Sequence, residues 1–77
     1  MKFLMYCIYD KQAAQYSVPR FTVNSNTAQR EFAAYCRKVQ EQGGDISDYT
    51  VYLVGEFDIA TAELKPFKNI VELTKGE

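Results

Sequence analysis

The sequence predicts a small α+β domain: a mostly antiparallel sheet of about three to four strands, with one long helix packed across one face. Three segments predict this class. Residues 3–9 form a continuous apolar run, residues 28–39 repeat apolar side chains at helical spacing, and residues 49–57 combine aromatic and branched residues at strand length. A chain of 77 residues has room for one domain, which we expect to span residues 1–77.

The first apolar run ends at Asp10. Its length fits a strand covered on both faces, so we expect it at the centre of the sheet. Residues 11–17 form a polar connector, and the sequence allows either a loop or a single helical turn there. Residues 18–23 look extended, and because Pro19 has no N–H to donate, they form an edge strand or an irregular stretch.

The predicted helix follows a cluster of capping residues at positions 24–27. With Asn26 as the N-cap, Gln29 stands at the N3 position of a capping box. Gly43 and Gly44 end the helix, because glycine adopts the left-handed conformation without a steric penalty. The apolar stripe consists of Ala28, Phe32, Tyr35, Cys36 and Val39. The opposite side carries Arg30, Glu31, Arg37, Lys38 and Glu41, a pattern typical of solvated helices, and its basic residues also suit phosphate contacts.

Residues 49–57 form the next predicted strand, with alternate side chains on opposite faces. One face carries Tyr49, Val51, Leu53 and Phe57, and the other carries Thr50, Tyr52, Val54 and Glu56. Residues 58–62 connect to a strand at 63–65, which Pro66 ends or places at an edge. Residues 67–73 add an extended or short helical piece, and we expect a frayed tail at residues 73–77.

The composition argues against catalysis. The chain has no histidine, and its two cysteines are far from any metal-ligand spacing. Cys7 lies in an apolar strand and Cys36 on the apolar stripe of the helix, so both are predicted to be buried, and nothing in the sequence forces them to pair. No glycine-rich loop precedes a helix. We therefore expect no enzyme activity, no metal site and no cofactor.

Six tyrosines and five phenylalanines exceed what so small a core needs, so some rings are expected to face a partner. A chain of this size is also only marginally stable by itself, which favours a homo-oligomer, most simply a dimer. The apolar N-terminal segment is too short for a membrane span or a secretory signal. We therefore expect no membrane partner and a cytoplasmic location.

Aromatic residues interleaved with basic ones are typical of proteins that bind single strands of nucleic acid. Two interpretations stay open. The rings form a stacking surface on the sheet face that the helix leaves open, or they are simply core and dimer interface, which the formal net charge of −1 favours. The candidate nucleic-acid contacts are Tyr9, Lys11, Tyr16, Arg20, Phe21 and Tyr52.

Four segments occur together in an order that resembles a known family. They are Tyr9-Asp10-Lys11, Pro19-Arg20-Phe21, Ala28-Gln29-Arg30-Glu31-Phe32, and the run Asp48–Asp58 with its Gly-Glu-Phe-Asp end. The chain resembles the small nonstructural protein of gokushoviruses, the microvirus branch of single-stranded DNA phages. It departs from that pattern at Ala62, where the family usually has glycine, and at Arg20, which separates the usual Pro-Phe pair.

The resemblance implies a phage accessory protein in the cytoplasm of the infected bacterial host. It implies binding of single-stranded DNA during genome replication or packaging. The alternative is a homo-oligomeric adaptor that engages a phage replication or capsid protein and makes no DNA contact. The alanine at position 62, in place of the family's usual glycine, suggests a hairpin turn of different geometry, because alanine adopts the left-handed conformation less readily than glycine.

Overall fold

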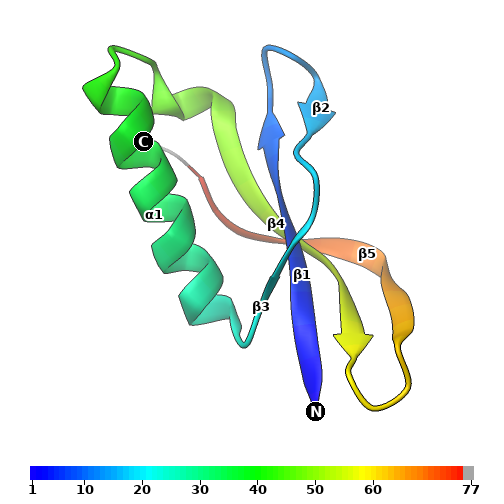
Figure 1. The fold of residues 1–77 in the computed structure, drawn as a ribbon. Helices are drawn as coiled ribbons and strands as arrows, with labels where there is room; N and C mark the ends of the chain where they lie inside the picture. Colours follow the sequence, from blue (N-terminus) through cyan, green and yellow to red (C-terminus); the bar gives the residue numbers. More distant parts are fainter. Residues whose placement is uncertain (76–77) are drawn as a thin grey trace.

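The computed structural model describes residues 1–75, with Lys75 described by its backbone alone. It confirms the α+β prediction: one helix lies beside a curled antiparallel sheet (Figure 1). The elements in chain order are β1 (Lys2–Asp10), β2 (Gln15–Tyr16), β3 (Arg20–Thr22), α1 (Ser25–Glu41), the short 3₁₀ turn η1 (Ile46–Asp48), β4 (Tyr49–Asp58) and β5 (Glu63–Lys75).

The strand order is β2-β1-β4-β5, and β3 pairs with β1 on the same edge as β2. The apolar run at residues 3–9 is therefore central, as predicted. The connector at 11–17 is a turn followed by β2, and the extended stretch contains the edge strand β3 directly after Pro19. These two short strands bring the sheet to five, more than the expected three to four.

The helix begins two residues earlier than predicted. Asn24, not Asn26, is the N-cap, because its extended backbone (φ −158°) lets its side-chain oxygen accept the Thr27 N–H at 2.8 Å. The predicted end is confirmed: Gly43 has φ +82°, and the Gly44 N–H donates to the Val39 carbonyl at 2.8 Å. This is the Schellman arrangement that glycine permits.

The core lies between α1 and one face of the sheet. Its buried members are Tyr6, Ala28, Phe32, Cys36, Ile46, Val51 and Leu53. Strand alternation directs Cys7 to the opposite face, where it is buried as well. Both cysteines are therefore buried, as predicted, and both are free thiols. Burial raises the pKa of each thiol, which favours the protonated form.

A β-bulge in β4 changes which face Phe57 occupies. Tyr6 pairs with Leu53 but Met5 pairs with Gly55, which leaves Val54 as an extra residue. Beyond this point the alternation of β4 is shifted by one residue. The prediction that Phe57 shares a face with Leu53 is therefore wrong: Phe57 lies on the face turned away from α1, which we call the open face.

The last strand is longer than predicted. Pro66 does not end it, and pairing with β4 continues to Thr74 and Lys75, where a frayed tail was expected; the rest of that predicted tail lies outside the described residues. The hairpin residues 55–66, which we call the arm, extend beyond the helix (Figure 1) and help to make the molecule 43 × 21 × 16 Å. At its tip Ala62 keeps a left-handed conformation (φ +64°) in place of glycine.

Candidate nucleic-acid interface

Three of the predicted contact residues come together on the open face at the end of the sheet near β2. Tyr9 and Tyr16 are direct partners across β1 and β2, and their ring centroids lie 4.7 Å apart. The Tyr52 ring, from β4, lies 5.9 Å from that of Tyr16 in an edge-to-face contact. Tyr16 is 48% exposed, whereas the other two rings are half-buried. Three strands thus build one tyrosine cluster, with its most accessible ring at the sheet edge.

The electrostatic environment of this cluster is uneven. Burial raises the pKa of Tyr52, and the carboxylate of Glu72 on β5 raises it further. A carboxylate therefore lies on the β5 side of Tyr52.

A pocket of about 270 Å³ lies on the other side of the β2 edge, between the sheet and α1. Its lining is rich in hydroxyl-bearing and charged residues: Tyr6, Ile8, Asp10, Gln15, Tyr16, Ser17, Arg20, Glu31, Tyr35 and Tyr49. Tyr16 thus belongs both to the tyrosine cluster and to the pocket wall. The pocket and the cluster are neighbours across a single strand.

One hydrogen bond joins the two walls of the pocket. The Tyr6 hydroxyl donates to Glu31 Oε1 at 2.7 Å. Burial, with help from this carboxylate, raises the pKa of Tyr6 to about 12, while the nearby charge of Arg20 acts in the opposite direction. Glu31 is thereby engaged with the sheet, and Tyr6 is a proton donor at neutral pH.

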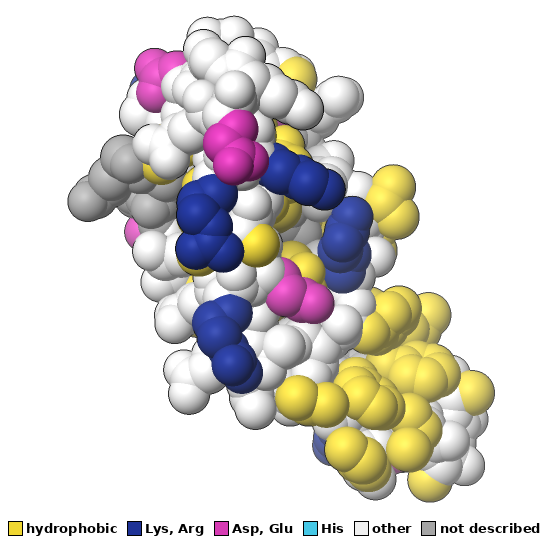
Figure 2. Space-filling model, turned by 60° about the vertical axis from the view of Figure 1, so that its left-hand side comes forward, with side chains coloured by type: hydrophobic (Ala, Val, Ile, Leu, Met, Phe, Trp, Pro, Cys, Tyr) yellow, Lys and Arg dark blue, Asp and Glu magenta, His cyan; other side chains and the backbone are white. Residues whose placement is uncertain are grey.

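The outer rim of the pocket carries positive charge. A second hollow of about 310 Å³ is lined by Arg20, Glu31, Ala34, Tyr35 and Lys38. Among the residues that the structure describes, neither Arg20 nor Lys38 has an ion-pair partner. Figure 2 shows basic side chains spread over the helix side of the molecule. Two cations and the carboxylate of Glu31 thus line the same hollow.

The other predicted contacts lie elsewhere. Lys11 follows β1 directly, and its backbone N–H donates to the Asp48 carbonyl at 2.9 Å, so it stays near the end of the sheet that holds Tyr9. Phe21 does not join the tyrosines. Its ring packs against Phe57, with centroids 5.7 Å apart, further along the open face.

Sequence reasoning missed several residues of the pocket. Tyr35 was assigned to the apolar stripe, but its ring is 38% exposed and meets the edge of the Tyr49 ring at 5.4 Å. A hydrogen bond with Tyr35 raises the pKa of Tyr49. The one hint of these residues in the sequence was Lys38, which lies on the basic side of the helix, one helical turn from Ala34. Only the position of Arg20 opposite α1 makes these residues one site.

Neither a metal-binding cluster nor a helix that could cross a membrane is found in the part of the chain that the structure describes. No group of three or more Cys, Asp or Glu side chains there is placed to hold a metal ion. The helix is also not long and apolar enough to cross a membrane.

Fold and site together define a small α+β protein with a tyrosine cluster on one sheet face and basic side chains near the sheet edge. The model of the Phage ORF5 protein family matches residues 3–77, so the chain belongs to this family of phage proteins. The match confirms the prediction of a small phage protein and is compatible with the gokushovirus resemblance. No curated protein and no solved structure matches the chain.

Proposed function

We propose that this phage accessory protein binds single-stranded DNA in the cytoplasm of the infected host, during genome replication or packaging. The observation that carries the proposal is the tyrosine cluster of Tyr9, Tyr16 and Tyr52, in which Tyr16 also lines the pocket that Arg20 borders. Exposed rings on a sheet stack with bases irrespective of sequence, and neighbouring Arg and Lys side chains bind the backbone.

The uneven distribution of charge around the tyrosine cluster sets the path of the DNA strand. Bases stack on Tyr16 and the accessible parts of Tyr9 and Tyr52, and the phosphates follow the β2 edge toward Arg20 and Lys38. Glu72 keeps them away from the β5 side of the cluster. Because few cations take part and the formal net charge is −1, binding is expected to be weak and sensitive to salt.

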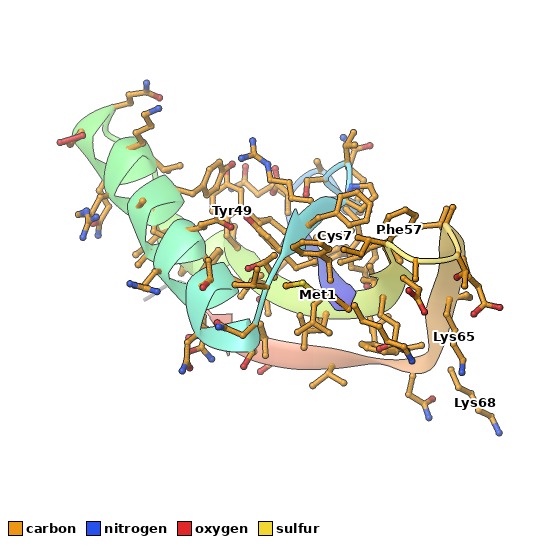
Figure 3. The ribbon with its side chains drawn as sticks, turned by 60° about the horizontal axis from the view of Figure 1, so that its bottom comes forward. Met1, Cys7, Tyr49, Phe57, Lys65 and Lys68 are labelled. Carbon is orange, nitrogen blue, oxygen red and sulfur yellow. The ribbon has the colours of Figure 1, made fainter. Side chains whose placement is uncertain are left out.

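Fluorescence anisotropy with labelled oligo-dT, at low and high salt, tests the proposal. Tyr16→Ala should weaken binding about tenfold, whereas Tyr16→Phe keeps the ring and should bind almost as well as wild type. Arg20→Ala should weaken binding and lower the dependence on salt. Lys68→Ala removes the same charge from β5, where Figure 3 shows this side chain pointing away from the body of the protein, and should change little.

An adaptor that binds only protein is the second candidate, and the exposed apolar side chains of the arm favour it. The same titration separates the two. No change in anisotropy at low salt, with protein in the tens of micromolar, would reject DNA binding and leave the adaptor. Binding that is lost equally in Tyr16→Phe and Tyr16→Ala would reject the stacking role of the cluster.

A further inference from the structure

We propose that the apolar end of the open face is the interface of a homodimer, in which the arms of two copies pack face to face. This apolar end consists of Phe3 and Met5 of β1, Phe21 of β3, Phe57 of β4, and Leu64 and Pro66 of β5. The inference is independent of DNA binding, because it involves the other end of the open face from the tyrosine cluster.

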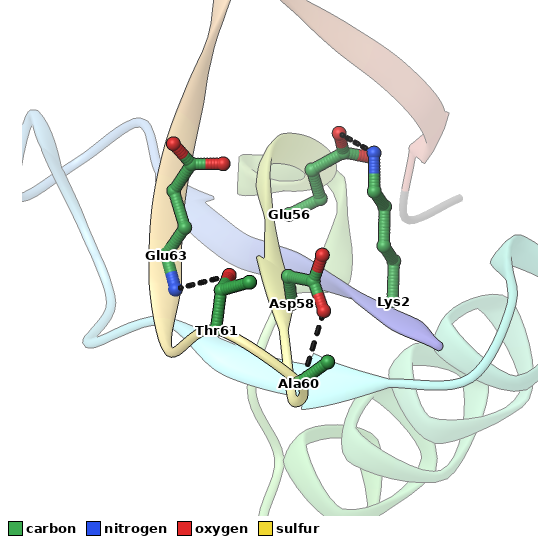
Figure 4. Close-up of polar contacts among 6 residues, drawn as sticks. All are labelled: Lys2, Glu56, Asp58, Ala60, Thr61 and Glu63. Carbon is green, nitrogen blue, oxygen red and sulfur yellow. Dashed lines mark hydrogen bonds and ion pairs between the residues drawn. The ribbon is translucent and has the colours of Figure 1, made fainter.

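The two faces of the arm differ sharply in chemistry. On the side opposite the apolar end, direct cross-strand partners are Lys2 with Asp58, Glu56 with Lys65, and Asp58 with Glu63. Figure 4 shows Lys2, Glu56, Asp58 and Glu63 on this side, with Lys2 Nζ and Glu56 Oε1 3.4 Å apart. One face is therefore adapted to water, and the other has neither charge nor hydroxyl to bind it.

Nothing in the described part of the chain covers the apolar end. Phe21 is 51% exposed and Leu64 is 60% exposed, and Met1 and Ile59 add further exposed apolar surface at the tip. Figure 2 shows hydrophobic side chains gathered at the end of the molecule that the helix does not reach. Contiguous apolar surface of this kind marks an interaction site.

The chain exposes more surface than a compact monomer of its mass. A compact monomer of 8.8 kDa is expected to expose about 4,800 Å², but this chain exposes 5385 Å². Its radius of gyration is 13.0 Å, against about 11.5 Å for a compact chain of this length. The excess area of roughly 600 Å² approaches the ~800 Å² that each partner contributes to a standard interface.

A second copy of the chain fits this surface for two reasons. A face without charge is self-complementary across a two-fold axis, because no like charges meet there. The arm also resists the other common mode of self-association, in which edge strands pair. Pro66 lies in the outer strand β5 and has no N–H to donate, which leaves packing through the face.

Sedimentation velocity of the full chain between 1 and 100 µM tests the dimer. The wild type should approach twice the 8.8 kDa mass of one chain. Leu64→Glu puts a charge on the apolar end and should raise the dimer dissociation constant at least tenfold. Lys65→Gln is the matched control: it changes the net charge by the same amount on the adjacent residue, on the opposite face, and should leave the dimer intact.

Hydrogen exchange at the two extremes of concentration gives a second readout that does not need a variant. Amides of the arm should become better protected as concentration rises, while those of α1 should not change. A wild-type chain that stays monomeric at 100 µM overturns the proposal. So does a dimer that survives Leu64→Glu and Phe21→Glu, or one that Lys65→Gln dissociates as readily as Leu64→Glu does.

Discussion

The hydroxyl of Tyr6 on β1 donates to the carboxylate of Glu31 on α1 across 2.7 Å, and this bond ties the sheet to the helix at the wall of the pocket. The Tyr6 side chain is buried, whereas Glu31 is largely exposed. The tyrosine therefore depends on this partner to satisfy a polar group inside the core. The contact also holds α1 opposite the β2 edge, where the cations of the rim lie.

Stability should fall as the pH rises from about 10 to about 12, and Tyr6 should account for part of that loss. The pKa of Tyr6 is raised from 10.0 to about 12 in the folded chain, so the unfolded chain releases this proton first and is favoured in that window. Below pH 10 the contribution is fully present. Tyr6→Phe has no proton to lose, so its urea midpoint should fall less between pH 9 and 12 than that of wild type. Parallel declines would contradict the assignment.

Replacing Ala62 by glycine should stabilise the protein by roughly 0.5–1 kcal/mol, because glycine tolerates a positive φ that costs alanine energy. Ala62 has φ +64°, and Ala14 in the β1–β2 turn has φ +54°, so Ala14→Gly should act likewise. Ala60 shares the hairpin turn with Ala62 but lacks a positive φ. Ala60→Gly is therefore the control and should stabilise nothing. Urea denaturation measures all three.

Gly55→Ala should destabilise the base of the arm by about 1–3 kcal/mol through overpacking. A Cβ atom at this position would lie 2.6 Å from Met5 Cε, 2.7 Å from the Lys65 carbonyl oxygen and 3.2 Å from Pro66 Cα. The methionine tip can move aside, but the two backbone atoms of β5 cannot. Faster hydrogen exchange in residues 55–66 would locate the damage. An unchanged unfolding free energy would show that β5 yields without cost.

Glu72→Gln should strengthen binding of oligo-dT severalfold at low salt. It removes the carboxylate beside Tyr52, which repels phosphates from that side of the tyrosine cluster. Glu63→Gln removes the same charge on the arm and serves as the control. The gain should shrink as salt is added, because screening weakens the repulsion. Equal gains from both variants would indicate an effect of net charge, not of position.

Much of the fold follows from local patterns in the chain. The helix could be predicted because its stripe and its terminal glycines are separated by only a few residues, and the central strand because it is apolar throughout. The start of the helix was misplaced because several neighbouring residues can cap, and only backbone geometry selects Asn24. The long course of β5 was missed because Pro66 usually disfavours a strand, although proline is tolerated in an edge strand such as β5.

The candidate site was only partly predictable. The residue types were recognised, and Tyr9, Tyr16 and Tyr52 do meet, because strand alternation directs them to one face. Phe57 was assigned to the wrong face because strict alternation was continued past the bulge at Val54, although Gly55, the next residue, is of the type that often marks a bulge.

The sequence by itself determined a one-helix α+β chain whose aromatic rings exceed its core. The tertiary structure decided how these rings divide between the tyrosine cluster and the apolar end of the open face. The physical reason is that one extra residue in a strand moves every later side chain to the opposite face of the sheet. Whether such a bulge forms depends on pairing between segments that are remote in the chain.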